Sequence, residues 1–358
     1  MNRRRFAGAA AGLAGGAVLL KTQAPPSWLA SDQRPARSRV ALLTASAYSE
    51  KLDEIVCEGL RLFDLQLRGQ TVLLKPNLVE YIPGVEVNTN PWLVGAAAEA
   101  FLRLGAGKVI VGEGPGHQRD TQLVVAESGL ERQLKDRKIA FVDLNRDDLV
   151  RVRTESSYTN LGELWLPQSV VSADIVVSMP KVKTHHWAGV TLSMKNMFGI
   201  IPGAVYGWPK NVLHWHGIER SILDICSTMR PHFVIADGIV AMEGNGPLHG
   251  THRAMNKLVL SDDPVAADFT CARLMGLLPE KIYHLEQAAR FLGNGAFEMI
   301  QTLGEEMPER IESFTVLPQF EHLQRSRLRS QNSSRRQPAD LRHHGVLATP
   351  ARPFCHWG

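Results

Sequence analysis

The chain has 358 residues, 44% of them hydrophobic, which is enough to bury a large core as one large or two smaller domains. Its net charge of +4 is misleading: residues 1–39 hold seven Lys/Arg and one acid (+6) and residues 319–358 hold seven Arg and two acids (+5), which leaves −7 on residues 40–318. An acidic body lacks the basic surface of nucleic-acid-binding proteins, so we expect no nucleic-acid partner.

Residues 1–30 have the pattern of a twin-arginine signal. Arg3-Arg4-Arg5-Phe6 is followed by an uncharged run of Ala, Gly and Leu that is short and weakly hydrophobic for a membrane span. We therefore expect export by the twin-arginine route to the periplasm or another extracytoplasmic location. The segment is either a signal or a retained N-terminal anchor, which would be the only membrane contact. A disordered basic tail is the alternative. Residues 31–38 are expected to be a linker.

The body, residues 39–318, alternates strand patterns with helix patterns. This alternation is typical of an α/β fold, in which helices cover a mostly parallel or mixed sheet, as a single domain or as two lobes. The expected strands, in chain order, are 39–44, 71–75, 108–112, 139–143, 163–166, 174–179, 233–237 and 257–261. The expected helices are 52–67, 91–104, 122–134, 216–229, 264–275 and 281–291. From residue 319 the chain is rich in Arg without apolar periodicity, so we expect a disordered tail.

Polar residues follow two of the early strands. Lys75 and Asn77 stand at the end of strand 71–75, and Glu113 follows strand 108–112 in a glycine-rich segment. Ligands of open α/β sheets bind at the carboxyl ends of strands. We therefore predict that Lys75 and Asn77 bind substrate and that Glu113 acts as a base or carboxylate ligand. The glycine spacing is not that of a dinucleotide-binding loop. An exposed loop lysine and a plain turn are the alternatives.

The segment 174–199 is the most informative, because a buried-strand pattern runs directly into a dense set of polar residues. These residues are Lys181, Lys183, His185, Lys195 and Asn196. In an extended chain the first three share one face by the period of two. We predict an anion clamp in which His185 and Lys183 transfer protons and the others bind substrate. A solvated basic loop is the alternative.

Histidines and carboxylates further along the chain predict a metal site as one alternative. The candidate ligands are His214, His216, Asp237 and Glu243. A His-x-His pair in an extended chain shares a face, which suits a transition metal. The acidic glycine-rich loop with Asn245 fits a cation or a hydroxylated substrate. For the histidines, helix capping and core packing are the alternative interpretation.

Taken in order, five segments resemble those of the domain of unknown function 362 family, over about residues 70–290. They are KPNL, GEGPG, ADIVVSMPKVKTHHWAGVTLSMKNMFG, DGIVAMEGNGP and SDDPVAAD. Members are often called iron–sulfur proteins, because many carry a ferredoxin-like segment. This chain has four separated cysteines without CxxC spacing, so we expect no cluster on its own cysteines. The resemblance implies the fold and the pocket residues. Because many members are called iron–sulfur proteins, it also implies a role with a redox partner as one alternative.

The residues support two classes of function. The first is an exported enzyme that performs proton transfer, such as isomerisation or racemisation, on a small anionic substrate. The second is a non-catalytic accessory protein that binds an anion or a metal in the same pocket. A divalent metal is the one cofactor alternative that the side chains suggest. The sequence does not indicate the substrate or the oligomeric state.

Overall fold

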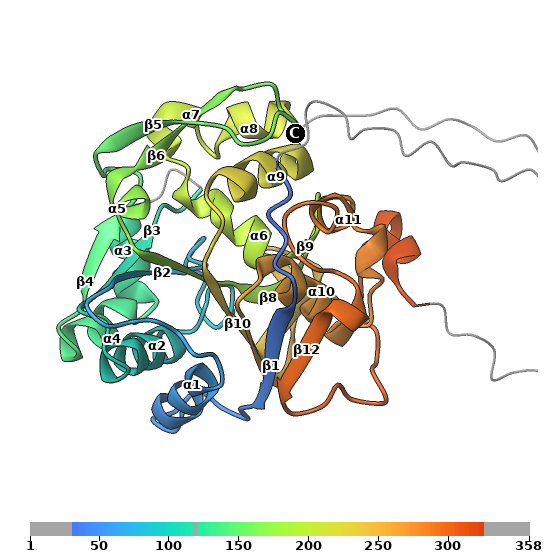
Figure 1. The fold of residues 1–358 in the computed structure, drawn as a ribbon, viewed down its shortest axis with the longest axis horizontal. Helices are drawn as coiled ribbons and strands as arrows, with labels where there is room; N and C mark the ends of the chain where they lie inside the picture. Colours follow the sequence, from blue (N-terminus) through green and yellow to red (C-terminus); the bar gives the residue numbers. More distant parts are fainter. Residues whose placement is uncertain (1–30, 117–119, 326–358) are drawn as a thin grey trace, which may run out of the picture. The chain divides into compact units, whose positions relative to one another are not determined.

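The computed structural model describes residues 31–116 and 120–325 (Figure 1). The predicted twin-arginine segment, residues 1–30, lies outside the described residues, and so do residues 326–358 of the predicted tail. The described part is an α/β fold, as the sequence predicts, with one large mixed sheet and helices on both of its faces. Within these ranges no helix has the length and apolar character needed to cross a bilayer.

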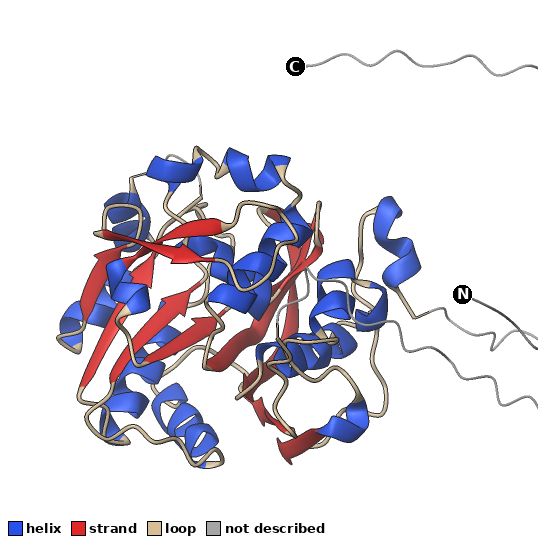
Figure 2. Ribbon diagram, turned by 45° about the horizontal axis from the view of Figure 1, so that its top comes forward, coloured by secondary structure: helices blue, strands red, loops and turns tan. Residues whose placement is uncertain are grey.

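The large sheet has ten strands and joins a parallel half to an antiparallel half (Figure 2). Its path is β12-β1-β11-β10-β7-β2-β3-β4, and β8 pairs with both β10 and β9. Strands β10, β7, β2, β3 and β4 run parallel, whereas β11 is antiparallel to β10 and β1. The strands are β1 Ser38–Thr44, β2 Thr71–Pro76, β3 Lys108–Glu113, β4 Ala140–Asp143, β7 Ile175–Met179, β8 Lys181–His185, β9 Gly189–Thr191, β10 Phe233–Asn245, β11 His249–Ser261 and β12 Ile300–Gly304. A separate antiparallel pair consists of β5 Leu149–Arg153 and β6 Glu163–Pro167.

Two apolar cores cover the two faces of the sheet, because successive side chains of a buried strand point in opposite directions. In β2, Val72 and Leu74 belong to one core and Leu73 to the other. The first core is closed by α1–α4 and the second mainly by α6, α9, α10 and α11. The helices are α1 Leu52–Arg61, α2 Pro91–Arg103, α3 Thr121–Glu127, α4 Leu130–Asp136, α5 Gln168–Val171, α6 Ser193–Asn196, α7 Gly203–Tyr206, α8 Asn211–Trp215, α9 Ile218–Thr228, α10 Pro264–Leu274 and α11 Tyr283–Ala288. Four 3-10 turns are η1 Met197–Ile200, η2 Pro279–Lys281, η3 Phe297–Met299 and η4 Pro318–Leu323.

Several element boundaries differ from the sequence predictions. The helix expected over 122–134 is divided into α3 and α4 at Gly129, whose φ of +79° favours glycine. Strands β10 and β11 each have 13 residues, and only their inner ends were predicted. Their outer halves pair with each other as a hairpin that extends beyond β1 and β7 but stays within the sheet, where β8 pairs with β10. This hairpin supplies one wall of the site described below.

Part of the predicted tail is folded. η4 includes residues 319–323, the side chain of Leu323 is buried, and the carbonyl of Leu323 accepts a hydrogen bond from the N–H of Leu278 at 2.7 Å. The predicted start of the tail at residue 319 is therefore too early. The sequence pattern did not indicate this segment, because its few apolar residues pack against residues that are distant in the chain.

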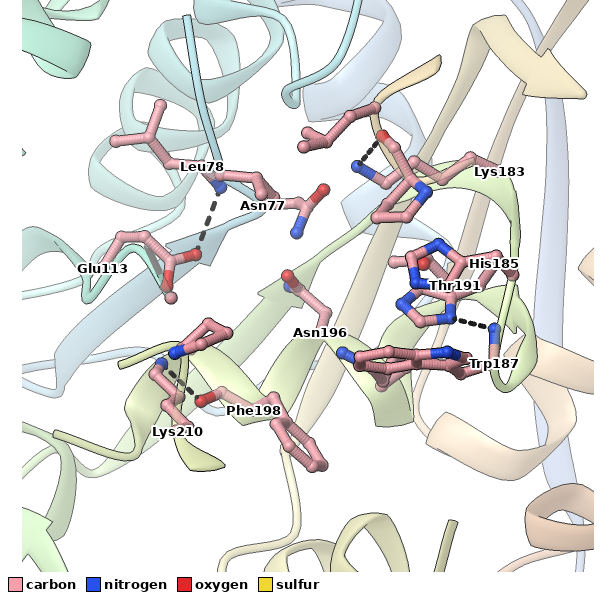
Figure 3. Close-up of a pocket in the computed structure, with 18 of the residues that line it drawn as sticks. Asn77, Leu78, Glu113, Lys183, His185, Trp187, Thr191, Asn196, Phe198 and Lys210 are labelled. Carbon is pink, nitrogen blue, oxygen red and sulfur yellow. Dashed lines mark hydrogen bonds between the residues drawn. The ribbon is translucent and has the colours of Figure 1, made fainter. Parts of the chain in front are cut away.

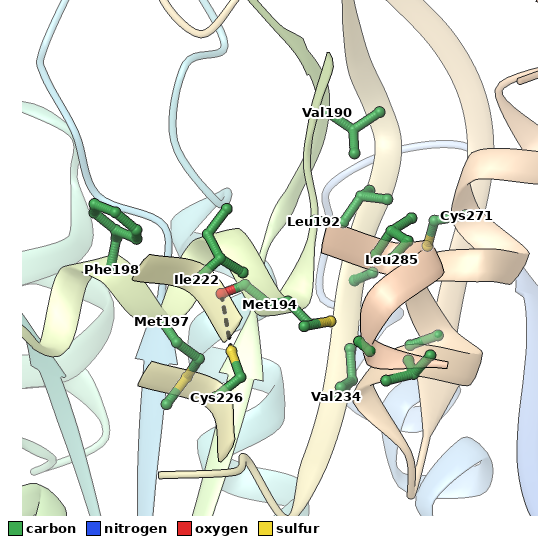
Figure 4. Packing of buried hydrophobic residues seen from close by; sticks show 14 of the residues in the cluster. Val190, Leu192, Met194, Met197, Phe198, Ile222, Cys226, Val234, Cys271 and Leu285 are labelled. Atoms are coloured by element: carbon green, nitrogen blue, oxygen red, sulfur yellow. Dashed lines mark hydrogen bonds between the residues drawn. The ribbon is translucent and has the colours of Figure 1, made fainter. Parts of the chain in front are cut away.

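The cysteines among the described residues are buried and free. Cys226 and Cys271 belong to the second core, where the thiol of Cys226 donates to the carbonyl of Met194 at 3.4 Å (Figure 4). Cys57 lies in the other core. Burial raises the pKa values of Cys226 and Cys271 well above the ordinary value. These three thiols therefore pack as small apolar side chains. Cys355 lies outside the described residues.

Candidate functional site

A cavity of about 250 Å³ lies where the parallel strands end (Figure 3). β2 and β3 pair in register and end side by side, the β8–β9 hairpin continues beyond β7, and the turn between β10 and β11 closes one side. The predicted site residues that line the cavity are Lys75, Asn77, Glu113, Lys183, His185, Lys195, Asn196, His214 and Asn245. The strand-end rule thus brings together residues from segments that are far apart in the sequence.

The floor of the cavity holds a buried ion pair between Lys75 and Glu113. The two charged atoms, Nζ and Oε2, are 2.5 Å apart, and both side chains are almost completely buried. Lys75 Nζ also donates to Asn196 Oδ1 at 3.0 Å. Glu113 accepts from the backbone N–H groups of Leu78 and Gly114. Since hydrogen bonds surround both charges, this pair is a rigid part of the wall.

Among the described residues, the hydrogen-bond partners of two further buried lysines are all backbone carbonyls. Lys183 Nζ donates to the carbonyls of Val87 at 2.9 Å and Pro247 at 3.3 Å. Lys210 Nζ donates to the carbonyls of Gly114 and Phe198, both at 2.8 Å. An ammonium group has three N–H donors, so each lysine keeps one donor beyond these two bonds.

A third lysine, Lys195, is partly buried in the same wall and lies over the ring of Phe198, with its Nζ 4.4 Å from the ring centre. No ion pair joins Lys183, Lys195 or Lys210 to a carboxylate within 31–116 and 120–325. This distinguishes these three lysines from Lys75. We call them the unpaired lysines of the cavity.

Burial makes the charged form of these lysines less favourable. It lowers the pKa of Lys210 from the ordinary 10.5 to about 7. Burial, together with the nearby charge of Lys75, lowers the pKa of Lys195 to about 8. Burial, with the charges of Lys181 and Lys195, holds the pKa of Lys183 well below its ordinary value. An anion in the cavity would offset the lost hydration of a lysine beside it and favour the charged form of that lysine.

His185 is held in one tautomer by the backbone. Its Nδ1 accepts hydrogen bonds from the N–H groups of Trp187 and Ala188, both at 3.1 Å. Nδ1 is therefore unprotonated, and the neutral ring carries its proton on Nε2. Burial and the charge of Lys195 hold the pKa of His185 well below 6.5. His185 can donate a hydrogen bond from Nε2, but it has no free lone pair with which to accept a proton.

His186 and His214 have the opposite tautomer. Nδ1 of His186 lies 2.9 Å from the carbonyl of Gly246, and Nδ1 of His214 lies 3.1 Å from the carbonyl of Lys210. A carbonyl oxygen only accepts, so each Nδ1 is the donor and each neutral ring has a lone pair on Nε2. Burial lowers the pKa of His214. With Trp187, whose ring contacts both histidines edge-on, they form an aromatic wall of the cavity.

The predicted metal ligands do not share a site. His214 lines the cavity, His216 is exposed with its Nδ1 3.0 Å from the carbonyl of Thr159, and Glu243 pairs with Arg253 at 2.8 Å. Asp237 is committed to Lys181, at 3.0 Å. His214 and His216 lie at the end of α8, and a helix directs side chains two residues apart in different directions. Within the described ranges, no three His, Cys, Asp or Glu side chains are grouped so as to hold a metal ion.

Lys181 does not bind into the cavity, contrary to the prediction. Its Nζ contacts Asp237, the hydroxyl of Tyr48 at 2.8 Å and Glu86 at 3.5 Å. Burial and the charge of Asp237 raise the pKa of Tyr48. The extended strand does place Lys181 and Lys183 on one face, but nearby acidic groups bind the first. We call Lys181, Asp237, Tyr48 and Glu86 the paired network.

Sequence reasoning missed several residues of the cavity. They are His186, Trp187, Thr191, Phe198, Lys210 and His249. Lys210 follows Gly207-Trp208-Pro209 in a connection between short helices, with a φ of +70°. The expectation that ligand-binding residues follow strands does not apply to a connection between helices. The one local signal was a lysine directly after Trp208-Pro209, which is weak by itself.

Together the fold and the cavity define an α/β protein with a lysine-rich pocket at the carboxyl ends of its parallel strands. The chain belongs to the family described as domain of unknown function (DUF362), whose model matches residues 72–273. A thylakoid-associated protein of Synechocystis sp. is 32% identical over 223 residues, which make up 60% of this chain and 65% of that protein. The match therefore spans less than two thirds of the relative's length.

Two solved structures are also similar to this chain. The lactate racemase apoprotein of Thermoanaerobacterium thermosaccharolyticum is 13% identical, and the match covers 68% of this chain and 58% of that one with a TM-score of 0.42. A protein from Thermotoga maritima is 11% identical, with coverage of 64% and 59% and a TM-score of 0.35. Likenesses this distant identify no site residue in this chain.

Proposed function

We propose that the cavity binds a small anion and transfers a proton on it. The observation that carries the proposal is the group of unpaired lysines, Lys183, Lys195 and Lys210, around one cavity. A buried ammonium group without a counter-ion is unfavourable, and a bound carboxylate or phosphate would supply the missing negative charge. The size of the cavity, about 250 Å³, suits a small molecule.

Lys210 is the group we assign to proton transfer. When it is neutral, its two N–H groups satisfy the carbonyls of Gly114 and Phe198, and its lone pair remains available. A pKa of about 7 is well matched to a general acid or base at neutral pH. His185, which the sequence favoured for this role, instead supplies a hydrogen-bond donor at Nε2.

The reaction class is removal of a proton from a carbon beside a carbonyl group. The amine of Lys210 takes the proton, and the electron pair of the C–H bond moves to the carbonyl oxygen, where Lys195 stabilises the charge. Return of a proton to carbon gives isomerisation or racemisation. Figure 3 shows Lys183 across the cavity from Lys210. In its charged form Lys183 returns a proton to the other face of the substrate carbon.

The same pocket would sit outside the cytoplasm, because the proposal includes export by the twin-arginine route. Arg3-Arg4-Arg5-Phe6 and the uncharged run after it support this part. A protein that binds the anion without turnover is the alternative function. It is favoured by the fixed tautomer of His185, which removes one of the predicted catalytic groups.

Calorimetry tests the binding. Small carboxylates and inorganic phosphate are titrated into the protein at pH 8 in buffers of different ionisation enthalpy, which reveals proton uptake. We expect binding with uptake of protons, because the anion raises the lowered pKa values of the lysines. Lys195→Met should take up fewer protons, because its pKa of about 8 leaves it partly neutral before the anion binds, whereas Lys135→Met, an exposed lysine, serves as the control. If none of the anions binds, or if they bind without proton uptake, the proposal fails.

Hydrogen exchange tests the catalysis. Acids that bind are incubated with the protein in D₂O, and NMR follows loss of the hydrogen beside the carbonyl. We expect exchange that disappears in Lys210→Met, by about 10²-fold or more, because general base catalysis contributes that much. Binding without exchange would overturn the catalytic half of the proposal and leave the binding protein.

A further inference from the structure

Two buried polar atoms of the cavity wall have no hydrogen-bond partner among the residues that the structure describes. They are Oδ1 of Asn77 and Oγ1 of Thr191. The side chains are only 7% and 3% exposed. A buried polar group that lacks a partner costs free energy, so native proteins rarely keep one unless a ligand or water serves it. Here the two residues that carry such atoms line the same cavity.

The strand register explains why Thr191 belongs to the site. Thr191 of β9 lies directly opposite Lys183 of β8, and opposite residues of an antiparallel pair project from the same face. His185 follows on that face, and Figure 3 shows Thr191 beside it. The hydroxyl is therefore next to an unpaired lysine that we assign to the anion.

Asn77 is anchored from a different part of the cavity. Its backbone N–H donates to Thr89 Oγ1 at 2.8 Å, and its position directly after β2 points the amide into the cavity (Figure 3). The backbone thus fixes the residue while its side-chain oxygen remains free. Such an amide oxygen is an acceptor only, so it requires a ligand that carries a hydrogen-bond donor.

We propose that the anion bound in the cavity carries a hydroxyl group, which Asn77 and Thr191 recognise. This inference rests on the proposed function and names the class of ligand, a small hydroxycarboxylate. The ligand hydroxyl donates to Oδ1 of Asn77 and accepts from the hydroxyl of Thr191, while Lys183 and Lys195 hold the carboxylate. An acid without the hydroxyl leaves both groups unsatisfied, and buried groups left unpaired are strong determinants of specificity.

Calorimetry with matched pairs of acids tests the inference. The pairs are glycolate and acetate, lactate and propionate, and malate and succinate, and the members of each pair differ by one hydroxyl. We expect at least one hydroxylated acid to bind about tenfold more tightly than its partner, or better, as one to two buried hydrogen bonds allow. Thr191→Val has nearly the same shape and should reduce that preference to about threefold or less, with affinity for the deoxy acid unchanged. Thr302→Val, at an exposed threonine of β12, is the control.

The outcomes separate the inference from the function on which it rests. Equal affinity for both members of every pair overturns the inference, because water alone then serves Asn77 and Thr191, but it leaves the anion site standing. Failure of all six acids and phosphate to bind removes both. Thermal unfolding checks each variant, and Asn77→Leu provides a second test should Thr191→Val fail to fold. A preference that survives both substitutions also overturns the assignment.

Discussion

Lys181 and Lys183 are two residues apart on β8, and both are fully buried, but they have different surroundings. Lys181 belongs to the paired network, in which Asp237 lies 3.0 Å away and the Tyr48 hydroxyl 2.8 Å away. Lys183 has two carbonyl oxygens and no carboxylate among its described neighbours. The same residue type therefore has a counter-ion at one position and lacks a described one at the other, where we propose that an anion binds.

Because Lys181 and Lys183 are equally buried, burial alone does not identify a lysine that binds a ligand. The informative property is a buried charge whose counter-ion is missing from the fold, because such a charge is unfavourable until something binds. The ion pair of Lys75 with Glu113 shows the intermediate case, a paired lysine that forms the wall of the cavity. Three predictions test the contrast between the paired network and the unpaired lysines.

The largest expected effect is on stability. Lys181→Met leaves Asp237 as a buried carboxylate without its cation and should lower the free energy of unfolding by about 3–5 kcal/mol. Lys183→Met removes a buried charge that has no counter-ion and should leave stability unchanged or raise it. Urea unfolding of the two variants measures both values. Equal losses in the two variants would show that Lys183 is as structural as Lys181.

The second effect is on anion affinity. Lys183→Met should weaken binding of small carboxylates by roughly 10- to 100-fold, since a charge-assisted contact contributes about 1.5–3 kcal/mol. Tyr48→Phe alters the paired network with little change of shape and should leave affinity within about threefold. Calorimetry at pH 7 compares the two variants with the unsubstituted protein. If Tyr48→Phe lost as much affinity as Lys183→Met, the two groups of lysines would not be functionally separate.

The third effect is the pH dependence of the ligand-free protein. The pKa of Lys210 in the folded protein, about 7, lies below the ordinary 10.5, so the unfolded chain binds more protons between these values. The free energy of unfolding should therefore rise with pH in this window, by about 1.4 kcal/mol per pH unit for one lysine.

Lys210→Met provides the comparison for this slope. The variant should lose that part of the rise in stability between about pH 7 and 10, whereas Lys135→Met should keep it, because Lys135 is exposed. Urea unfolding at a series of pH values gives both slopes. An unchanged slope in Lys210→Met would mean that Lys210 is not the group that titrates there.

Much of the fold could be predicted because its pattern is local. The apolar runs of β2, β3 and β7 and the helices between them have periods that a sequence shows directly. Lys75 and Glu113 were then found by the strand-end rule. The outer halves of β10 and β11 were missed, because glycines interrupt the apolar pattern of β10 and polar, exposed residues dominate the outer half of β11.

The site was predicted less completely, because hydrogen bonds between distant segments decide what each residue can do. His185 was correctly placed in the cavity, but two backbone N–H groups that fix its tautomer weaken its expected role as a base. Lys210 enters from a connection without strand character. The side-chain oxygens of Asn77 and Thr191 were missed as well, because the sequence does not show which residues surround them or that these residues offer no hydrogen bond.

The α/β alternation, the polar residues at strand ends and the lysines of residues 174–199 can therefore be read from the residue pattern. Which of these lysines have a counter-ion depends on the folded chain. Lys181 reaches Asp237 across 56 residues of sequence, whereas the hydrogen bonds of Lys183, two residues further, go to carbonyl oxygens in the part of the chain that the structure describes. Periodicity is a local property, but the pairing of a buried charge depends on which distant side chain lies within about 4 Å of it.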